Sequence, residues 1–413
     1  MATEVNDEVP RFLNSAYVEN LMKKIVREKV KVVKYTVNPV AKKGNHYGSI
    51  VLRMVVDYTV GFKEQKQISL ILKTGYDDKY NEEGGVKFTK EFDFQKREVH
   101  MYGKVLDCFH DLLSSINDKT TFSCRCYTID RTTNTTILED LLVRQYRCAN
   151  RIERLDLNHT KLILKKLAKF HACSVILKKK EPNVYEPMEK ALFSRDGGDA
   201  RDFCLALYDA GIDFVSKWPG YEYYVNKMKQ FRKKFVEKGI EMCELDKDFN
   251  VLLHGDMWNM NTMFKYDHDG NPVDVLFVDY QVPYYASPAI DLMYFIHSSI
   301  KEDLRLEKQD ELVQYYYKHL KETLIDGFKY DGKFPSLLEF QIIVLKKSPF
   351  IIVSLFVVLP ICLLTEGTDA NLITLISQDE EGVKFREKMF NSSGVAEAIK
   401  KMLPYLDAKG VFD

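Results

Sequence analysis

The stretch from Val251 to Gln281 reads VLLHGDMWNMNTMFKYDHDGNPVDVLFVDYQ. It contains two short apolar runs: Asp256 lies just past the first, Asp279 directly follows the second, and Asn261 stands between them. The Asp, Asn, Gly and Pro residues around Gly270 predict a β-hairpin. Antiparallel pairing about Gly270 sets Asn261 opposite Asp279, because residues equidistant from the turn face each other. We therefore expect both side chains at the open end of the hairpin, beside the loop that carries Asp256.

These three side chains have the chemistry of a phosphoryl-transfer site. Magnesium (Mg2+) prefers oxygen ligands and takes one or two carboxylates together with substrate phosphates, so Asn261 and Asp279 are candidate metal ligands. Asp256 is then free to orient an acceptor hydroxyl and to accept its proton. Taken singly, each residue would also suit a turn or a strand-end cap. Taken together with the hairpin pairing, they favour a catalytic site.

Composition limits the class of protein. The chain has 413 residues, enough for two or three domains or lobes. Lys+Arg and Asp+Glu both number 60, so no overall charge attracts nucleic acid, and a small-molecule partner is expected. The polar N-terminal segment does not resemble a secretory signal, and the eight cysteines show no CxxC pair. A cytoplasmic protein with reduced thiols is therefore expected.

Residues 348–364, SPFIIVSLFVVLPICLL, are apolar throughout. This segment is shorter than the roughly 20 residues that a membrane-spanning helix needs, and it contains Pro349 and Pro360. Lys346 and Lys347 precede it and would suit either a membrane flank or an exposed helix start. We expect a buried core helix and no membrane insertion.

The N-terminal part has the pattern of a small β-rich lobe. Residues 50–60 alternate between apolar and other side chains, which predicts a half-buried strand, and 32–37 predicts a shorter one. Gly44, Gly48 and Ser49 lie in the connection, where glycines would let the backbone approach a phosphate. An ordinary hairpin turn would look the same.

A lysine and a glutamate in this part predict an ion pair. Lys73 lies near the end of an apolar strand, 67–74, where most lysines are solvated edge residues. Glu98, however, falls on the apolar stripe of a predicted helix, 90–106, and a carboxylate directed at a core needs a cation. A strand lysine followed by a helix glutamate matches the pair that holds nucleotide phosphates in kinases.

The chain between the two parts predicts a hinge. Residues 135–141, TTILEDL, form a short apolar strand that ends in acids. In a kinase the backbone around Glu139 and Leu141 would meet the adenine edge, although a plain edge strand has the same pattern. Beyond it, a long amphipathic helix is predicted over 157–177, with His171 expected to be a satisfied core histidine rather than a ligand.

The remainder is predicted to be helical, over 203–217, 221–238 and 310–328 as well as the apolar segment. There are no internal repeats and no low-complexity tract. One catalytic unit of two lobes fits this pattern better than two independent domains.

A resemblance to a known family covers nearly the whole chain. It is carried by LLHGDMWNMNTMF and FVDYQVPYYASPAIDLMYF, with further agreement in GNHYGS, ILEDLL, LDLNHTKLILKKLAKFHA and LPYLDAKGVFD. These runs resemble the ecdysteroid kinase-like (CHK kinase-like) family of the protein kinase and aminoglycoside phosphotransferase superfamily. The resemblance implies an α+β, two-lobed protein-kinase-like fold. Residues 1–138 would form a small antiparallel-β lobe that binds the nucleotide, and 139–413 a larger, mostly helical catalytic and substrate-binding lobe.

The resemblance also implies roles for individual residues. Asp256 would be the catalytic base, braced by His254, and Asp291 would have a structural role at a helix start. The remaining roles are those of the nucleotide and metal site: phosphate contact by Lys73, support of that lysine by Glu98, and magnesium binding by Asn261 and Asp279.

Two departures from the family pattern limit these expectations. Asp279 is followed by Tyr280 and Gln281 in place of the Phe-Gly of protein kinases, so an activation-loop switch is not expected. The phosphate loop lacks the usual glycine triad, which leaves its contacts undefined.

The expected function is an ATP-dependent small-molecule O-kinase, with ATP and Mg2+ as cofactors. The resemblance implies as acceptor an ecdysteroid or another lipophilic or xenobiotic alcohol, and hence a role in detoxification; a monomer is expected. One alternative is a choline- or aminoglycoside-type kinase, whose acceptor pocket should carry carboxylates for a cationic substrate. The other is a catalytically inactive protein that binds a steroid-like ligand.

Overall fold

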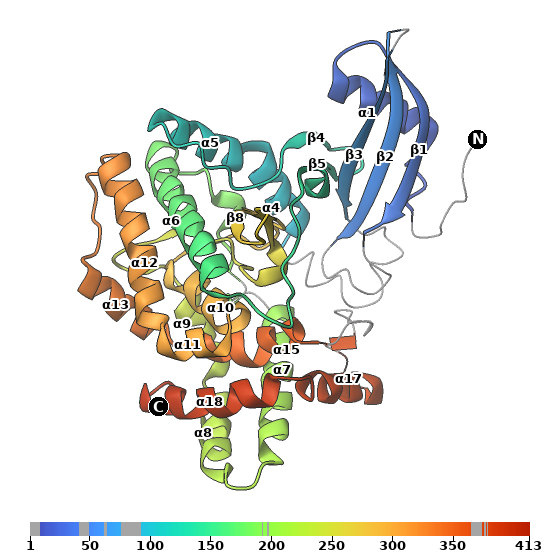
Figure 1. Cartoon of the computed structure of the whole chain (residues 1–413). Coiled ribbons are helices and arrows are strands. Elements are labelled where there is room, and N and C mark those ends of the chain that lie inside the picture. Colours follow the sequence, from blue (N-terminus) through green and yellow to red (C-terminus); the bar gives the residue numbers. More distant parts are fainter. Residues whose placement is uncertain are drawn as a thin grey trace.

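The computed structural model describes residues 9–40, 49–61, 64–75, 92–191, 193–195, 198–364, 374–375, 377 and 379–413. Figure 1 shows a twisted β-sheet with one helix at one end of the molecule and a larger, mostly helical body at the other. The two-lobed α+β arrangement predicted from the sequence is confirmed. The boundary predicted between residues 138 and 139 stays a prediction.

The smaller part is a five-stranded antiparallel sheet in the order β1-β2-β3-β5-β4. Alternation of side chains places one face of β2 in a core shared with helix α1, where Leu52, Met54 and Val56 are fully buried. The predicted strand over 50–60 is confirmed residue for residue. The bounds are α1 Ser15–Val26, β1 Val30–Pro39, β2 Ile50–Val60, β3 Glu64–Thr74, β4 Cys126–Asp130 and β5 Thr135–Glu139.

The opposite face of β3 looks toward the helical part. Leu70 and Leu72 lie in the core under α1, whereas Ile71 packs against the core of the larger part. Lys73, two residues from Ile71, therefore points the same way, as the alternation predicts. A continuous helical stretch then crosses the molecule, made of α4 (Phe94–His100), a π-helical turn η1 (Met101–Val105) and α5 (Leu106–Ser115).

The larger part is built around α6 (Leu157–Lys180) and α10 (Ala289–Ser299), with α12 (Gln309–Lys321) packed along α6 (Figure 1). Every residue of α10 is buried. The predicted helix over 221–238 is wrong in one respect: the chain breaks after Arg232, and Phe235 begins a second helix that packs its ring on Tyr208. The other elements are η2 Leu141–Arg144, η3 Glu186–Met188, α7 Asp199–Ser216, α8 Glu222–Arg232, α9 Phe235–Cys243, α11 Glu302–Glu307, η5 Glu322–Gly327, α13 Leu337–Lys346, α17 Glu380–Phe390 and α18 Val395–Ala408.

Four short strands lie inside this helical part. They are β6 Val251–Leu252 paired with β9 Tyr285–Ala286, and β7 Thr262–Tyr266 paired with β8 Pro272–Phe277; a single turn, η4 Asn259–Asn261, precedes β7. Ser174 of α6 accepts a hydrogen bond from Leu252 N–H at 2.9 Å, which ties β6 to the central helix. These strands carry the residues of the sequence stretch described first.

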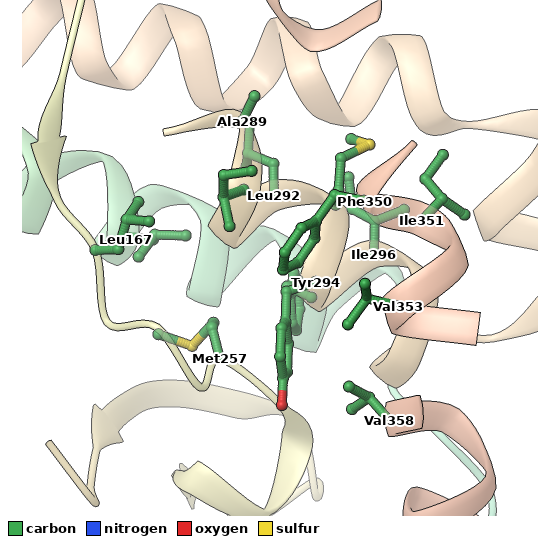
Figure 2. Packing of buried hydrophobic residues seen from close by; sticks show 14 of the residues in the cluster. Leu167, Met257, Ala289, Leu292, Tyr294, Ile296, Phe350, Ile351, Val353 and Val358 are labelled. Carbon is green, nitrogen blue, oxygen red and sulfur yellow. The ribbon is translucent and has the colours of Figure 1, made fainter. Parts of the chain in front are cut away.

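The apolar segment 348–364 forms α14 (Phe350–Val353), η6 (Ser354–Val358) and α15 (Leu359–Cys362), and it is buried as predicted. Figure 2 shows its side chains, among them Phe350 and Val358, facing Tyr294 and Ile296 of α10. Within the described residues no single helix is long and apolar enough to cross a membrane. One pair, α13 with residues 350–362, passes by length and composition, but it is bent by 55°.

Candidate active site

The hairpin of β7 and β8 is present, but its register differs from the predicted one. Lys265 pairs with Asp274, whereas Tyr266 pairs with Pro272, so Val273 is an extra residue on the second strand. At the turn the pairing is therefore centred on Asp269 rather than Gly270, and the extra residue shifts the outer pairs back by only one, which leaves Asn261 opposite Val278, whose N–H donates to Asn261 O at 3.0 Å. The prediction that Asn261 faces Asp279 across the hairpin is therefore wrong by one residue.

Gly255 shapes the loop that carries Asp256. Its φ of +81° lies in the left-handed region, and a Cβ at this position would stand 1.9 Å from Val282 O. Glycine alone tolerates both conditions, because any side chain would meet backbone that cannot move aside. The loop between His254 and Asp256 can therefore lie directly against the segment that follows Asp279.

Asp291 of α10 holds the loop at 254–256 through hydrogen bonds to its backbone. Its carboxylate accepts the N–H of His254 at 2.8 Å and that of Gly255 at 3.0 Å. It also accepts a bond from His171 Nε2 at 3.1 Å, while Tyr316 OH lies 2.6 Å from His171 Nδ1. His171 is thus a satisfied core histidine, as predicted. Asp291, to which the sequence resemblance gave a structural role at a helix start, thus positions the backbone of the loop at 254–256.

His254 braces the loop from the side of β8. It is fully buried, and its Nε2 lies 3.1 Å from Val278 O, a carbonyl that can only accept. Nε2 therefore carries the proton, and Nδ1 has no hydrogen-bond partner among the described residues. Burial lowers the pKa of His254, which keeps the imidazole neutral. This geometry suits a structural brace rather than a proton-transfer group.

The Asp256 carboxylate receives a hydrogen bond on each oxygen. Asn261 Nδ2 donates to Asp256 Oδ2 and to its backbone O, both at 2.9 Å, and Tyr294 OH donates to Oδ1. The pKa of Asp256 is raised to about 6, chiefly by burial and also by the nearby charge of Asp279, while the hydrogen bonds from Tyr294 and Asn261 oppose the rise. With this pKa, Asp256 is mostly ionised near neutral pH and can still take up a proton, which suits a general base.

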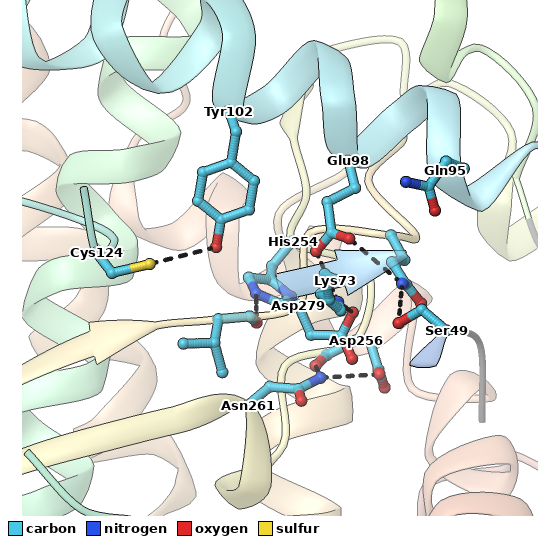
Figure 3. A network of polar contacts seen from close by, with 12 residues as sticks. Ser49, Lys73, Gln95, Glu98, Tyr102, Cys124, His254, Asp256, Asn261 and Asp279 are labelled. Carbon is cyan, nitrogen blue, oxygen red and sulfur yellow. Dashed lines mark hydrogen bonds and ion pairs between the residues drawn. The ribbon is translucent and has the colours of Figure 1, made fainter. Parts of the chain in front are cut away.

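Lys73, Glu98 and Asp279 meet in one ionic cluster (Figure 3). Lys73 Nζ lies 2.7 Å from Glu98 Oε1 and 2.6 Å from Asp279 Oδ1. The predicted ion pair of Lys73 and Glu98 is thus present. Burial by itself lowers the pKa of Lys73, but the charges of Asp279 and Glu98 outweigh it and raise the pKa, so the ammonium group stays charged.

Asn261 and Asp279 fit a magnesium ion. Because Asn261 donates through Nδ2, its amide Oδ1 remains an available acceptor, and Asp279 uses only Oδ1 on Lys73. Asp279 has a left-handed backbone, with φ of +65°, and a side chain that is 37% exposed, so its carboxylate is accessible to an ion. No cluster of three His, Cys, Asp or Glu with metal-binding geometry occurs within the described ranges. An amide and one carboxylate completed by phosphates is the set that magnesium accepts.

The other predicted nucleotide contacts are placed as follows. Ser49 is buried at the start of β2, and its Oγ accepts a hydrogen bond from Gln281 Nε2 at 3.1 Å. Gly44 and Gly48 lie outside the described residues. Glu139 ends β5 with its carboxylate 3.2 Å from Arg144 NH1, and Leu141 begins the turn η2 and is buried. Contact of these segments with a nucleotide stays a prediction.

Asp140, which sequence reasoning gave no role, fixes the connection between β5 and η2. Its carboxylate accepts Arg53 Nε and Ser69 Oγ, each at 2.7 Å, and the N–H of Leu142 at 3.1 Å. The backbone on either side is therefore anchored to β2 and β3. Its position directly after an apolar strand was visible in the sequence, but its partners were not.

Tyr294 and Gln281 also had no assigned role. Tyr294 lies three residues after Asp291, close to one helical turn, so both face the loop at 254–256. That spacing was the available signal for Tyr294. For Gln281 the only available signal in the sequence was its position two residues after Asp279.

Comparison with known proteins adds the family. The model of the ecdysteroid kinase-like family matches residues 43–327. Among solved structures, the GDP complex of wild-type aminoglycoside 2'-phosphotransferase-IIIa aligns over 94% of this chain and 98% of its own at 10% sequence identity, with a TM-score of 0.44. A search of curated protein sequences gives no match. Since the family model matches well over half of its residues, the chain belongs to the ecdysteroid kinase-like family.

Proposed function

We propose that this protein is an ATP-dependent kinase that phosphorylates a hydroxyl of an ecdysteroid or another lipophilic alcohol. The observation that carries the proposal is the meeting of Lys73, Glu98 and Asp279 beside the hydrogen-bonded pair of Asp256 and Asn261. Membership of the ecdysteroid kinase-like family supports a small-molecule phosphotransferase. The acceptor class is our inference from the family and from the surroundings of Asp256.

On the nucleotide side, Lys73 is the group that meets phosphate. Its ammonium group is held by Glu98 from one side and touches Asp279 on the other. Phosphate oxygens compete with Asp279 for Lys73 Nζ, and a displaced Asp279 becomes free to bind metal. Asn261 and Asp279 would hold the magnesium ion, which would supply positive charge against the negative charge that develops on the phosphates. Glu98 keeps Lys73 in place during this exchange.

On the acceptor side, Asp256 orients the substrate hydroxyl. The acceptor oxygen forms a bond to the γ-phosphorus as the bond between that phosphorus and the β–γ bridging oxygen breaks, and ADP leaves. The hydroxyl proton passes to the Asp256 carboxylate. Tyr294 and Asn261 hold that carboxylate in one orientation, so most of the rate enhancement comes from positioning and charge neutralisation.

The surroundings of Tyr294 favour an apolar acceptor. The ring centroids of Tyr294 and Phe350 are 6.5 Å apart, and Figure 2 shows Val353 and Val358 on the same side of α10. A cationic acceptor, as in the choline- or aminoglycoside-type alternative, needs several carboxylates to bind it. The inactive alternative has less support, because the acids and the lysine proposed for transfer are all present, and Lys73 contacts both Glu98 and Asp279.

The test is a screen of acceptor alcohols with labelled ATP and magnesium, in which the products are identified by mass spectrometry. The panel contains ecdysteroids, plant and drug-like xenobiotic alcohols, choline and aminoglycosides. We expect a mass gain of one phosphoryl group on a steroid or xenobiotic alcohol and none with an Asp256→Asn variant. Phosphorylation confined to choline or aminoglycosides would favour the first alternative. Binding of a steroid without any transfer to it would favour the second.

A further inference from the structure

The segment after Asp279 is anchored inside the larger part by Tyr280. The Tyr280 side chain is fully buried, and its hydroxyl donates to Phe122 O at 3.2 Å. Its ring stacks on Phe170 of α6 at 6.0 Å and meets Tyr102 edge-on at 5.6 Å. Turning this residue out would expose an aromatic ring and break a buried hydrogen bond, both of which cost free energy.

Gln281, the next residue, reaches in the opposite direction. It is 4% exposed, and its Nε2 lies 3.1 Å from Ser49 Oγ and 3.4 Å from Glu98 Oε2. Both hydrogens of the amide nitrogen are thus directed at acceptors, one at the start of β2 and one on α4. Contacts of this kind join segments that lie 232 and 183 residues apart in the chain.

These contacts close a ring of interactions around the nucleotide site. Lys73 binds Glu98 Oε1 and Asp279 Oδ1, Gln281 binds Glu98 Oε2, and the backbone joins Asp279 to Gln281. Figure 3 shows Lys73, Glu98, Asp279 and Ser49 converging in this region. Movement of α4 away from β3 would have to break the bonds of Lys73 and Gln281 to the same carboxylate together. A glycine at position 281 would have no side chain to contribute.

We propose that Gln281 is a positioning residue that holds Glu98 and Ser49 in the arrangement that binds nucleotide, so that this kinase is assembled without an activation-segment switch. The inference rests on the proposed function, because it concerns the same nucleotide site. Glu98 is the residue that most needs such support. It is fully buried, and one positive charge, Lys73, is shared between it and Asp279. The amide supplies a second donor to Glu98 without adding charge.

The test compares Gln281→Leu and Gln281→Glu with the wild type. Leucine removes the donor at similar size, and glutamate keeps the shape but faces Glu98 with a second carboxylate. Gln309→Leu is the matched control, because Gln309 is also buried, at 9% exposed, and accepts a hydrogen bond from Tyr405 OH at 3.1 Å away from the site. Thermal denaturation of each variant establishes that it folds.

Two quantities are measured on the full chain. The first is the dissociation constant for Mg-ATP, which we expect to rise about tenfold in Gln281→Leu and further in Gln281→Glu. The second is the rate at which an amine-acylating reagent modifies Lys73 without nucleotide, followed by peptide mass spectrometry. This rate should rise severalfold in Gln281→Leu, because a loosened Glu98 leaves Lys73 more exposed to the reagent. Gln309→Leu should change neither quantity.

The two readouts separate failure of this inference from failure of the proposed function. If the wild type does not bind Mg-ATP, the proposed function fails, and the acylation rate alone decides the role of Gln281. If the wild type binds Mg-ATP and both folded variants bind it equally tightly, the positioning role is overturned. It is also overturned if folded Gln281→Leu keeps the wild-type acylation rate.

Discussion

At the scale of single residues, the roles of Asp256 and Asn261 in the catalytic loop differ although their side chains touch. Asn261 Nδ2 donates to both the backbone O and the Oδ2 of Asp256, which leaves the Oδ1 of Asn261 available as an acceptor. In the proposed mechanism, one hydrogen-bonded pair therefore separates the oxygen offered to the metal from the carboxylate that accepts the proton. This separation is what allows a mutation of either residue to be diagnostic.

Asp256→Asn should abolish transfer while leaving Mg-ATP binding nearly unchanged. A side-chain amide cannot take up the proton of the substrate hydroxyl, and loss of a general base lowers the rate about 10²–10⁴-fold. The measurement is the turnover number on an acceptor found in the screen, beside the dissociation constant for Mg-ATP. Turnover equal to the wild type would remove Asp256 from the reaction.

The pH dependence of transfer should follow Asp256 and should respond to Tyr294. Asp256 accepts a proton only when ionised, and its pKa is about 6, so activity should fall as the pH drops through that value. Tyr294→Phe removes a donor that stabilises the charged form, so the pKa rises and the acid limb of the rate profile moves to higher pH.

The control for this experiment is Tyr317→Phe. Tyr317 is 8% exposed, as is Tyr294, and its hydroxyl donates to Pro335 O on the far side of α12. Tyr317→Phe should leave the dependence of the transfer rate on pH unchanged. A Tyr294→Phe profile that superimposes on that of the wild type would show that this hydroxyl does not tune the base.

At the scale of elements, the loop at 254–256 depends on close contact between two backbones. Gly255 and Gly270 have nearly the same φ, +81° and +82°, but a Cβ at Gly270 would meet nothing within 4 Å. Alanine at Gly270 should therefore cost only the left-handed penalty, about 1–2 kcal/mol.

Gly255→Ala should cost much more than Gly270→Ala, because it adds a clash with Val282 O to the same backbone penalty. The expected result is a far larger fall in the unfolding temperature, or failure to fold, and loss of activity in any folded fraction. Equal destabilisation of the two variants by chemical denaturation would show that the loop can move away from Val282.

The elements themselves were largely predictable, whereas their register was not. The alternation over 50–60 is local and gave β2 correctly, because one face of a strand is buried. The bulge at Val273 depends on remote contacts: Phe277 N–H donates to Phe122 O at 2.7 Å, and Lys166 of α6 pairs with Asp274 at 2.8 Å. These bonds fix β8 in the observed register, in which Asn261 lies opposite Val278 rather than Asp279. Neither Phe122 nor Lys166 belongs to the hairpin, so the hairpin sequence alone could not predict this register.

At the scale of the whole molecule, nucleotide binding should stabilise both parts together. Lys73 comes from the sheet, and Asn261 and Asp279 come from the larger part, so one bound Mg-ATP links them. A ligand at about 100 times its dissociation constant adds about 2.7 kcal/mol to the stability of the state that binds it. The unfolding temperature should therefore rise with Mg-ATP, and less with ATP and a chelator.

Asp279→Ala should remove most of the part of this rise that depends on magnesium, because it deletes the carboxylate proposed to bind the ion. Asp269→Ala is the control, since Asp269 is exposed in the turn of the same hairpin and should keep the full shift. A wild-type shift in Asp279→Ala would remove Asp279 from the metal site.

The sequence by itself determined which residues are proposed to carry the chemistry. Asp256, Asn261 and Asp279 were visible because each is a polar residue placed just beyond an apolar run, and Glu98 because it lies on an apolar helix face. Lys73 followed from the need of a buried carboxylate for a cation. These are local patterns that burial imposes on neighbouring residues, so they can be recognised without a structure.

Only the tertiary structure decided how these residues are held. Tyr294 meets Asp256 across 38 residues, and Gln281 meets Ser49 across 232. Such partners are selected by the packing of α10 against the catalytic loop and by the approach of the sheet to α4, and no periodicity of the sequence encodes them. The chemistry of the stretch from Val251 to Gln281 is therefore local, whereas its geometry depends on the whole chain.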